Sequence, residues 1–168
     1  MVFQILGKRI CIKGKKLKLG LSAETLEKNL KNISNFGGII FLDDLDRIII
    51  NSYPLTLLIY YKKHWIALYI DENNLEIFDS TATVLNEAPK SLIHFLCNHS
   101  SKTINFNKKM QGNLTKLCGF YALYFILMKS KKYSWKKIMG ILKSKKNKDH
   151  FIRSIFSCTY KKTVDNSQ

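Results

Sequence analysis

Acidic residues are scarce in this sequence. It contains 12 aspartates and glutamates against 28 lysines and arginines, which leaves a formal net charge of +16 at pH 7. An excess of this size does not specify a fold, but it predicts attraction to polyanions, either nucleic acid or an anionic membrane surface. We favour nucleic acid, because no segment has the pattern of an amphipathic membrane helix.

Cysteine is also sparse. The four cysteines lie far apart, without a Cys-x-x-Cys pair or the spacing of zinc ligands, and they are Cys11, Cys97, Cys118 and Cys158. This pattern excludes a disulfide-stabilised scaffold and a structural zinc site. We therefore expect reduced thiols, no bound metal, and a protein that is intracellular and not secreted.

Long apolar runs are missing. The longest uncharged apolar run, Leu117 to Met128, has 12 residues, whereas a membrane-spanning helix needs roughly 20. The N-terminus lacks the continuous apolar core of a signal peptide. We expect no membrane association, and we interpret residues 117–128 as a helix buried in the centre of a domain.

The composition is that of a folded protein. The content of 46% hydrophobic and 12% aromatic residues argues against disorder, and 168 residues are enough for one domain with a proper core. Because the sequence contains no internal repeat and no linker, we predict a single domain over residues 1–168. It begins with a basic arm (1–20) and ends with a basic helical region (129–168).

Hydrophobic periodicity predicts a mixture of helices and strands. Ser22 is a suitable N-cap for a first helix with Leu26 and Leu30 on one face, and Gly37-Gly38 should end it. Strands are expected at residues 39–42, 48–50, 55–61, 65–70, 75–78 and 103–106, with an acidic turn at 43–46. Further helices are expected after Pro89, from Leu117, and at residues 135–142 and 151–156. The fold class is therefore α+β.

Cys118 has the features of a cysteine nucleophile. It lies just inside the start of the expected buried helix, where the helix dipole and free N–H groups lower the pKa of a thiol and can bind an oxyanion. Gly119 follows directly and would leave room for a substrate backbone in the groove. The alternative is that Cys118 is a small buried core residue.

Three polar residues elsewhere could complete a site with this thiol. His64 opens a strand before Trp65, Asp79 ends the neighbouring strand, and Gln111 lies in a polar loop ahead of Cys118. Across the hairpin, Asp79 can reach His64 and orient its imidazole. Each residue alone also has a simpler interpretation, as a surface histidine, a turn-forming aspartate and a loop amide.

The four residues occur in an informative order. The motifs are Lys63-His64-Trp65, Ile77-Phe78-Asp79-Ser80, and Gln111 to Phe120, in which six residues separate Gln111 from Cys118-Gly119. With Pro89 placed ahead of a short helix, this pattern over residues 37–128 resembles the adenovirus-type (adenain-like) cysteine proteases, including those of Maverick/Polinton elements and related viruses.

The resemblance implies a variant of the papain-like type of fold, in which a central mixed sheet packs against a buried helix that bears the nucleophile. It implies Cys118 as nucleophile, His64 as base, Asp79 as the group that orients the histidine, and Gln111 as an oxyanion donor together with the Cys118 N–H. Trp65 resembles the family's aromatic residue beside the base, which walls the substrate groove. Three further histidines match nothing in the family and are expected to be structural or exposed: His94, His99 and His150.

The resemblance also implies a function. We expect a cysteine endopeptidase that cleaves viral structural precursor polypeptides after Gly-Gly-type motifs during particle maturation. It would act as a monomer, in the virion and in the nucleus or cytoplasm of the infected cell. It would need no tightly bound cofactor, with DNA and an activating peptide as stimulators.

Two alternatives accompany this expectation. A protease specific for ubiquitin-like modifiers shares the same motif logic and also cleaves after Gly-Gly. A basic nucleic-acid-binding virion protein on an inactive protease fold is the alternative from a different class.

The lysine-rich C-terminal region predicts a polyanion surface. Nine lysines and no acidic residue occur between Lys129 and Lys148. The residues expected to contact DNA, through non-specific phosphate contacts, are Lys143, Lys145, Lys146 and Lys148. The N-terminal arm adds Lys8, Arg9, Lys13, Lys15, Lys16 and Lys18. The alternative is a solvated surface that only keeps the protein soluble.

Overall fold

The computed structural model describes residues 4–5, 8–9 and 20–157. Within the predicted basic arm, β1 (Gln4–Ile5) pairs with the antiparallel β2 (Lys8–Arg9). The other lysines of that arm, together with Cys11 and Cys158, lie outside the described residues. None of the helices in the described part of the chain is both long enough and apolar enough to cross a membrane.

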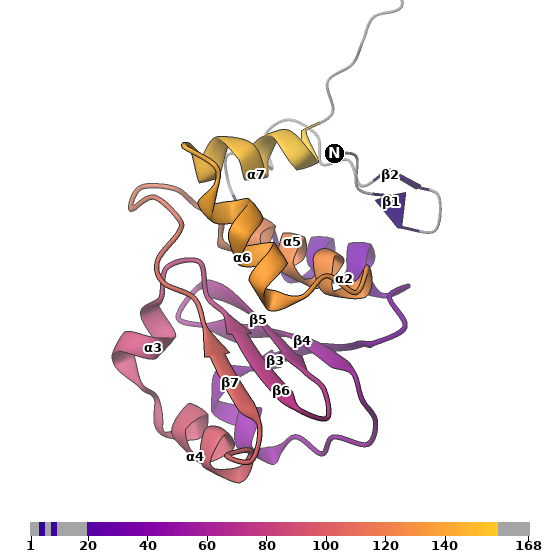
Figure 1. Cartoon of the computed structure of the whole chain (residues 1–168), viewed down its shortest axis with the longest axis vertical. Helices are drawn as coiled ribbons and strands as arrows, with labels where there is room; N and C mark the ends of the chain where they lie inside the picture. The colour runs from indigo at the N-terminus through magenta and orange to yellow at the C-terminus, as the bar shows by residue number, and fades with distance from the viewer. Residues whose placement is uncertain (1–3, 6–7, 10–19, 158–168) are drawn as a thin grey trace, which may run out of the picture.

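A mixed five-stranded sheet forms the centre of the molecule (Figure 1), with the strand order β3-β4-β5-β6-β7. The strands are β3 (Phe36–Phe41), β4 (Leu55–Tyr61), β5 (His64–Ile70), β6 (Asn74–Phe78) and β7 (Thr103–Phe106). The three central strands form an antiparallel meander, and the two edge strands each run parallel to their neighbour. Strands rich in β-branched and aromatic residues were predicted at 55–61, 65–70, 75–78 and 103–106, and these are confirmed.

Helices cover both faces of this sheet (Figure 1). One face carries α2 (Ala23–Leu30), α5 (Cys118–Ser130), α6 (Trp135–Lys143) and α7 (Lys148–Phe156). The other carries the 3₁₀ helix η1 (Leu42–Arg47), α3 (Thr83–Glu87) and α4 (Lys90–Asn98). As predicted, the side chain of Ser22 caps α2, by accepting a hydrogen bond from the N–H of Thr25.

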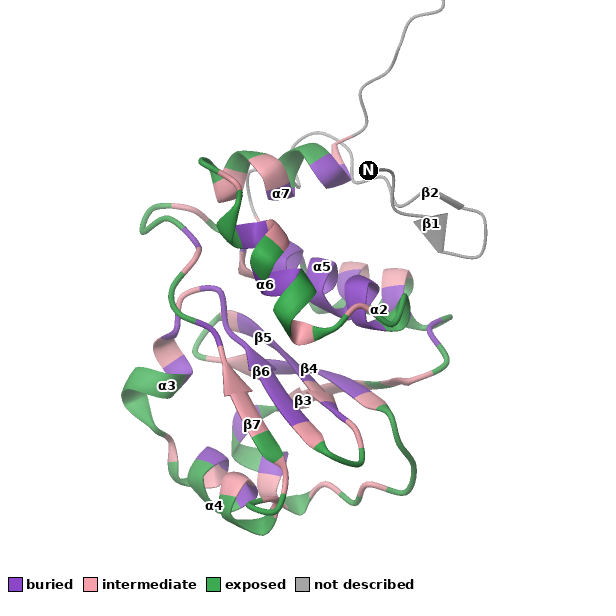
Figure 2. Ribbon diagram, viewed as in Figure 1, coloured by how far each residue is buried: buried purple, intermediate pink, exposed green. Residues whose placement is uncertain are grey.

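The central strands are buried on both faces (Figure 2), so their successive side chains enter two separate cores. Leu58, Ala67 and Phe78 face the core that contains α5. Leu57 and Ile77 face the core beneath η1 and α4. The sheet is therefore the middle layer of three, and its strand ends are fixed from both sides.

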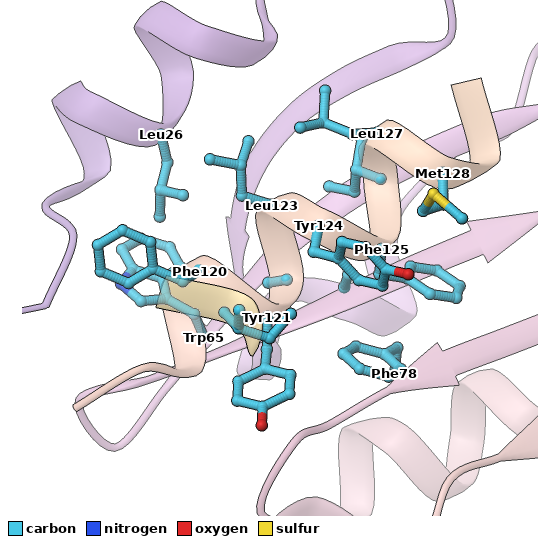
Figure 3. Close-up of a cluster of buried hydrophobic side chains, with 14 of the residues drawn as sticks. Leu26, Trp65, Phe78, Phe120, Tyr121, Leu123, Tyr124, Phe125, Leu127 and Met128 are labelled. Carbon is cyan, nitrogen blue, oxygen red and sulfur yellow. The ribbon is translucent and has the colours of Figure 1, made fainter. Parts of the chain in front are cut away.

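Helix α5 is the most deeply buried element. Residues 119–129 are all buried, which confirms the prediction of a central helix from this apolar run. Figure 3 shows its side chains against those of the sheet. The ring of Phe125 stacks on that of Phe78 with a centroid distance of 4.9 Å and an interplanar angle of 3°. This packing fixes the helix, and with it Cys118 at its N-terminus, over β5 and β6.

Two predicted boundaries are wrong. Gly37-Gly38 do not end the first helix, which stops at Leu30, but lie inside β3. At position 37 an added Cβ would come within 2.6 Å of the Leu55 side chain and 3.0 Å of the Leu57 side chain, so glycine lets these two leucines of the adjacent strand keep their positions. The predicted acidic turn at 43–46 is part of η1.

The predicted strand at residues 48–50 does not form. Its apolar sequence suggested a strand, but β3 already occupies the edge beside β4. Helix α3 was not predicted, because it has only five residues and its first turn is capped by a nearby carboxylate, described below, that hydrophobic periodicity does not reveal.

The turn between β4 and β5 carries a steric cost. Lys62 and Lys63 form a two-residue hairpin link, and both have positive φ angles, 46° and 64°. Such turns favour Asn-Gly, because a Cβ is unfavourable in the left-handed region. His64 follows directly, so this turn fixes the point at which the candidate base enters the sheet.

We therefore expect Lys63→Gly to stabilise the protein against urea by roughly 1 kcal/mol, because it removes the Cβ from a left-handed residue. Lys63→Ala is the matched control, since it removes the same charge but retains the Cβ. Equal unfolding free energies for the two variants would show that the turn is not strained at this position.

Candidate active site

Cys118 is the first residue of α5. This helix start is held between β5 and the segment that leads into α2, because Gly119 packs against Trp65 and Leu21. Cys118 itself is only partly buried, whereas the residues that follow it are fully buried. The thiol is therefore accessible at the positive end of a helix whose position is fixed by its own packing.

His64 joins Cys118 to Asp79. It is the first residue of β5, and its Nε2 lies 2.6 Å from Oδ1 of Asp79. Its ring also faces the Cys118 thiol, because the two groups interact closely enough for each to shift the pKa of the other. Because Asp79 occupies Nε2, the nitrogen that is left for the sulfur is Nδ1. The structure thus brings together the predicted nucleophile, base and orienting carboxylate.

The carboxylate of Asp79 is saturated with donors. Besides the His64 ring, Oδ1 accepts hydrogen bonds from the N–H and the hydroxyl of Thr81, each at 2.9 Å. The second oxygen, Oδ2, accepts the N–H of Val84 at 2.9 Å and so caps the start of α3. The side chain of Asp79 is only 4% exposed. These bonds fix its orientation and compensate for its burial.

The electrostatics favour an ion pair between His64 and Cys118. Burial lowers the pKa of His64, but the hydrogen bonds to Asp79 and Cys118 outweigh it and raise this pKa to about 9. Burial raises the pKa of Cys118, but hydrogen bonds from His64 and from the N–H of Trp65 lower it below its ordinary value. The pKa of Asp79, which burial raises, is likewise lowered overall by its bonds to His64 and Val84. Near neutral pH these shifts favour imidazolium and thiolate.

Gln111 lies in the loop before α5 and is fixed by both ends of its amide. Its Oε1 accepts a hydrogen bond from the hydroxyl of Ser80 at 2.8 Å, and its Nε2 donates to the carbonyl of Thr115. The main-chain carbonyl of Ser80 accepts the N–H groups of Met110 and Gln111. The predicted oxyanion donor Gln111 is thus held by hydrogen bonds to Ser80, the residue that follows Asp79.

Asn107 was missed by the sequence interpretation. Its buried side chain donates to the carbonyl of Asp79 at 2.7 Å and accepts the N–H of Asp79 at 2.8 Å. It follows β7, whose last residue, Phe106, pairs with Ile77 of β6. Asn107 comes just after β7 and Asp79 just after β6, so only the parallel pairing of these two strands brings the two residues together, and no local sequence pattern marks Asn107. Thr81, which contacts both Asp79 and His64, was also missed.

The interpretation of Gly119 as open space for substrate needs correction. A Cβ on Gly119 would meet Leu21 Cβ at 3.1 Å and Trp65 Cδ1 at 3.2 Å, so the space is filled by the protein. Trp65 donates from its indole N–H to the carbonyl of Leu21 at 3.0 Å. Trp65 also lines an apolar groove of about 390 Å³ together with Leu21, Ile39, Phe41 and Tyr60.

The remaining predicted residues lie outside this constellation. Lys143 ends α6 and Lys148 begins α7, with Lys145 and Lys146 between them. His94 lies 3.5 Å from Asp46, His99 bonds to the carbonyl of Phe95, and His150 is exposed. Among the described residues, no group of three or more His, Cys, Asp or Glu side chains is arranged to hold a metal ion.

No protein-family model matches the chain, and no curated protein matches it by sequence. Among solved structures, it is similar to the ASFV pS273R protease, with a TM-score of 0.56 and 16% identity over 91% of this chain and 73% of that one. The SUMO protease Ulp1 superposes less closely, with a TM-score of 0.49 and 14% identity over 83% of this chain and 81% of that one. The first likeness shows that the chain has a protease fold, and the predicted α+β architecture with Cys118 on the buried helix is confirmed.

The ion pair predicts how Cys118 reacts with iodoacetamide. Because the pKa of Cys118 is lowered, its alkylation should be faster than that of the exposed Cys97 at neutral pH and should reach its plateau at a lower pH than in His64→Ala. In His64→Ala the lost hydrogen bond should raise the pKa of Cys118, so its alkylation should become slow at neutral pH and rise in alkaline solution. Mass spectrometry of both cysteines between about pH 6 and pH 9 measures this. A pH profile that His64→Ala leaves unchanged would contradict the ion pair.

Proposed function

We propose that this chain is a cysteine endopeptidase. One observation carries the proposal: the ring of His64 is held at 2.6 Å by a buried, saturated carboxylate and bonds to a cysteine at a helix N-terminus. A structural cysteine needs none of these features. Together they generate the thiolate that nucleophilic catalysis requires.

These residues supply each step of peptide hydrolysis. The Cys118 thiolate attacks the scissile carbonyl carbon, and the oxyanion that forms is stabilised by the N–H of Cys118 and the amide of Gln111. One Nε2 hydrogen of Gln111 binds the carbonyl of Thr115, and a primary amide carries two. The His64 imidazolium then gives its proton to the leaving amine, and the C–N bond breaks to leave a thioester. Finally, His64 takes a proton from water, and the resulting hydroxide attacks the thioester carbonyl. The C–S bond breaks, the acyl half of the substrate leaves as a carboxylic acid, and the Cys118 thiolate and His64 imidazolium are restored.

The apolar groove beside Trp65 is suited to a substrate side chain. Its lining residues include Lys63 and Trp65, the two neighbours of His64, and it extends along β3 to Phe41. Phe41 is 62% exposed although it lies in a strand. We infer that an aliphatic residue upstream of the cleaved bond packs here, which agrees with the Gly-Gly motif preceded by an aliphatic residue that the resemblance to adenovirus-type proteases implies.

We infer that the substrates are viral structural precursors that are processed during particle maturation. The similarity to the ASFV pS273R protease supports a viral setting, as does the resemblance to adenovirus-type enzymes. A protease of ubiquitin-like modifiers would use the same residues on substrates with the same diglycine ending. The two classes of protease therefore have to be distinguished by the substrate that the enzyme cleaves.

The test uses two substrates and three proteins: the wild type, Cys118→Ala and Gln111→Ala. Wild-type protein should cleave a capsid-precursor peptide that contains a Gly-Gly site, and Cys118→Ala should abolish turnover while the thermal unfolding temperature stays near that of the wild type. Gln111→Ala should lower kcat on the order of 10²-fold, with little change in KM.

A diglycine-tailed ubiquitin-like modifier is the second substrate. Its preferential cleavage would reassign the enzyme to that class. If neither substrate is cleaved and a thiol-directed active-site probe does not label Cys118, the chain is an inactive protease fold, and the endopeptidase proposal fails.

We further propose that the lysines between α6 and α7 bind nucleic acid. Lys143 and Lys146 are exposed, and Lys146 and Lys148 line a hollow of about 440 Å³ beside the loop of Gln111. Lys145 is placed over the ring of Phe151 at 4.9 Å. Residues 129–148 contain no acidic residue. Asp149 lines the same hollow, but its carboxylate accepts hydrogen bonds from Gly112, Thr115 and Tyr121 and pairs with none of these lysines.

Affinity for double-stranded DNA should therefore fall steeply with salt. Each contacted phosphate contributes a slope of about −0.9 to log K against log salt concentration. Replacement of Lys143, Lys145, Lys146 and Lys148 by glutamine should make the slope shallower and leave hydrolysis of a short peptide without DNA unchanged. Filter binding between about 50 and 200 mM salt measures this slope. If the wild-type protein does not bind at 50 mM salt, the lysines serve solubility alone.

A further inference from the structure

Asp149 connects three separate segments near the candidate active site. It belongs to the first turn of α7. Its Oδ2 accepts hydrogen bonds from the N–H of Gly112 at 3.2 Å and from the hydroxyl of Thr115 at 3.0 Å. Its Oδ1 accepts the hydroxyl of Tyr121 at 2.8 Å. One carboxylate thereby joins the C-terminal helix, the loop before α5, and α5 itself.

The two loop residues that Asp149 contacts, Gly112 and Thr115, also determine where the side-chain amide of Gln111 lies. Gly112 is the next residue in the chain, and the carbonyl of Thr115 accepts the hydrogen bond from Gln111 Nε2. The hydroxyl of Thr115 also lies 3.1 Å from the carbonyl of Gly112. A shift of either residue would therefore displace the amide of Gln111.

The approach of Asp149 to the loop is close. A Cβ on Gly112 would come within 2.9 Å of Asp149 Oδ2, so this contact depends on glycine at position 112. The loop is otherwise poorly covered, because Leu114 at its tip is 99% exposed. Its placement consequently depends on hydrogen bonds more than on apolar packing.

Tyr121 holds the carboxylate of Asp149 at a fixed place beside α5. It lies one helical turn after Cys118 on α5, and its side chain is fully buried. Burial and the hydrogen bond to Asp149 raise the pKa of Tyr121, so its hydroxyl remains a donor throughout the physiological range. The carboxylate of Asp149 is thus anchored to the same helix that carries the nucleophile.

We propose that Asp149 is a positioning residue that sets the place of the oxyanion donor Gln111 relative to Cys118. This inference rests on the proposed endopeptidase function. Asp149 acts through the loop of Gln111 and does not touch the substrate. Through this one side chain, α7 supports the oxyanion donor, although the motifs that resemble adenovirus-type proteases end before this helix.

A simpler role for Asp149 would be to stabilise the N-terminus of α7 by its negative charge. The two roles respond differently to substitution. Asp149→Asn removes the charge but can still accept the Gly112 N–H with its oxygen, while its NH₂ group donates to the hydroxyl of Tyr121. Asp149→Ala removes the charge and all three hydrogen bonds. His150→Ala is the matched control, because this neighbouring side chain on α7 is exposed.

Peptide hydrolysis provides the first measurement. Asp149→Ala should lower kcat by roughly 10- to 100-fold with little change in KM, as expected for a displaced oxyanion donor. Asp149→Asn and His150→Ala should stay within about threefold of the wild type. The double variant Asp149→Ala/Gln111→Ala should be no slower than Gln111→Ala alone, because the first effect passes through the second residue. Additive losses would overturn the proposal.

Hydrogen–deuterium exchange provides a measurement that needs no turnover. Amides of residues 111–117 should exchange about tenfold faster or more in Asp149→Ala, and at wild-type rates in Asp149→Asn and His150→Ala. Unchanged exchange in Asp149→Ala would overturn the proposal, as would equal acceleration in Asp149→Asn, which would indicate the charge alone. Should Asp149→Ala not fold, Tyr121→Phe removes one of the three bonds and should accelerate exchange in the same segment.

The two proposals fail in different ways. A wild-type protein without peptidase activity would reject the endopeptidase function, while the exchange experiment still decides whether Asp149 holds the loop. An active wild-type protein whose kcat is unaffected by Asp149→Ala would reject the role of Asp149 alone. Alkylation of Cys118 should be unchanged in Asp149→Ala, because His64 and not the loop stabilises the thiolate.

Discussion

Helix α5 has a continuous run of buried residues, 119–129, so the rest of the fold has to shield this helix from water on all sides. A helix that is apolar on all sides must lie in the middle of a core, and here the sheet covers one side while α2, α6 and α7 cover the others. The burial of each large side chain contributes roughly 1.5–3 kcal/mol. The position of Cys118 follows from this constraint, because its helix has little freedom to shift.

The far end of the same helix is held by a buried ion pair. Lys129 lies 2.9 Å from Glu76 of β6, and its ammonium lies 3.7 Å from the centre of the Tyr69 ring on β5. Burial raises the pKa of Glu76, although the hydrogen bond from Lys129 opposes it. Buried pairs of this kind stabilise little but penalise any register that separates them. We infer that the pair fixes how far α5 extends along the sheet, and so where its first residue lies.

Hydrogen bonds between polar residues hold the segments around the N-terminus of α5 in place. Asp79 has to satisfy the donors of His64, Thr81 and Val84 at once, and Asn107 satisfies its main-chain groups. A buried carboxylate without such partners would be protonated or displaced. The same principle applies to Asp149 and the loop of Gln111. Both carboxylates hold segments that hydrophobic packing does not hold.

The sequence by itself determined the elements and the order of the site residues. Local patterns identified β4, β5, β6 and α5, because buried strands and helices need runs of apolar side chains. The order of His64, Asp79, Gln111 and Cys118 and the motifs around them resembled those of adenovirus-type cysteine proteases, and this resemblance predicted the site before any geometry was known. Only the tertiary structure decided which other residues hold these site residues in position by hydrogen bonds. Asn107 contacts Asp79 from 28 positions away, and Asp149 contacts Gly112 from 37 positions away. Residues 48–50 were misjudged for the same reason, because β3 occupies the sheet edge beside β4, and pairing between remote segments is not encoded in local periodicity. Helix α3 was missed for a different reason: it has only five residues, and a polar cap from Asp79, five positions before Val84, leaves no mark in hydrophobic periodicity.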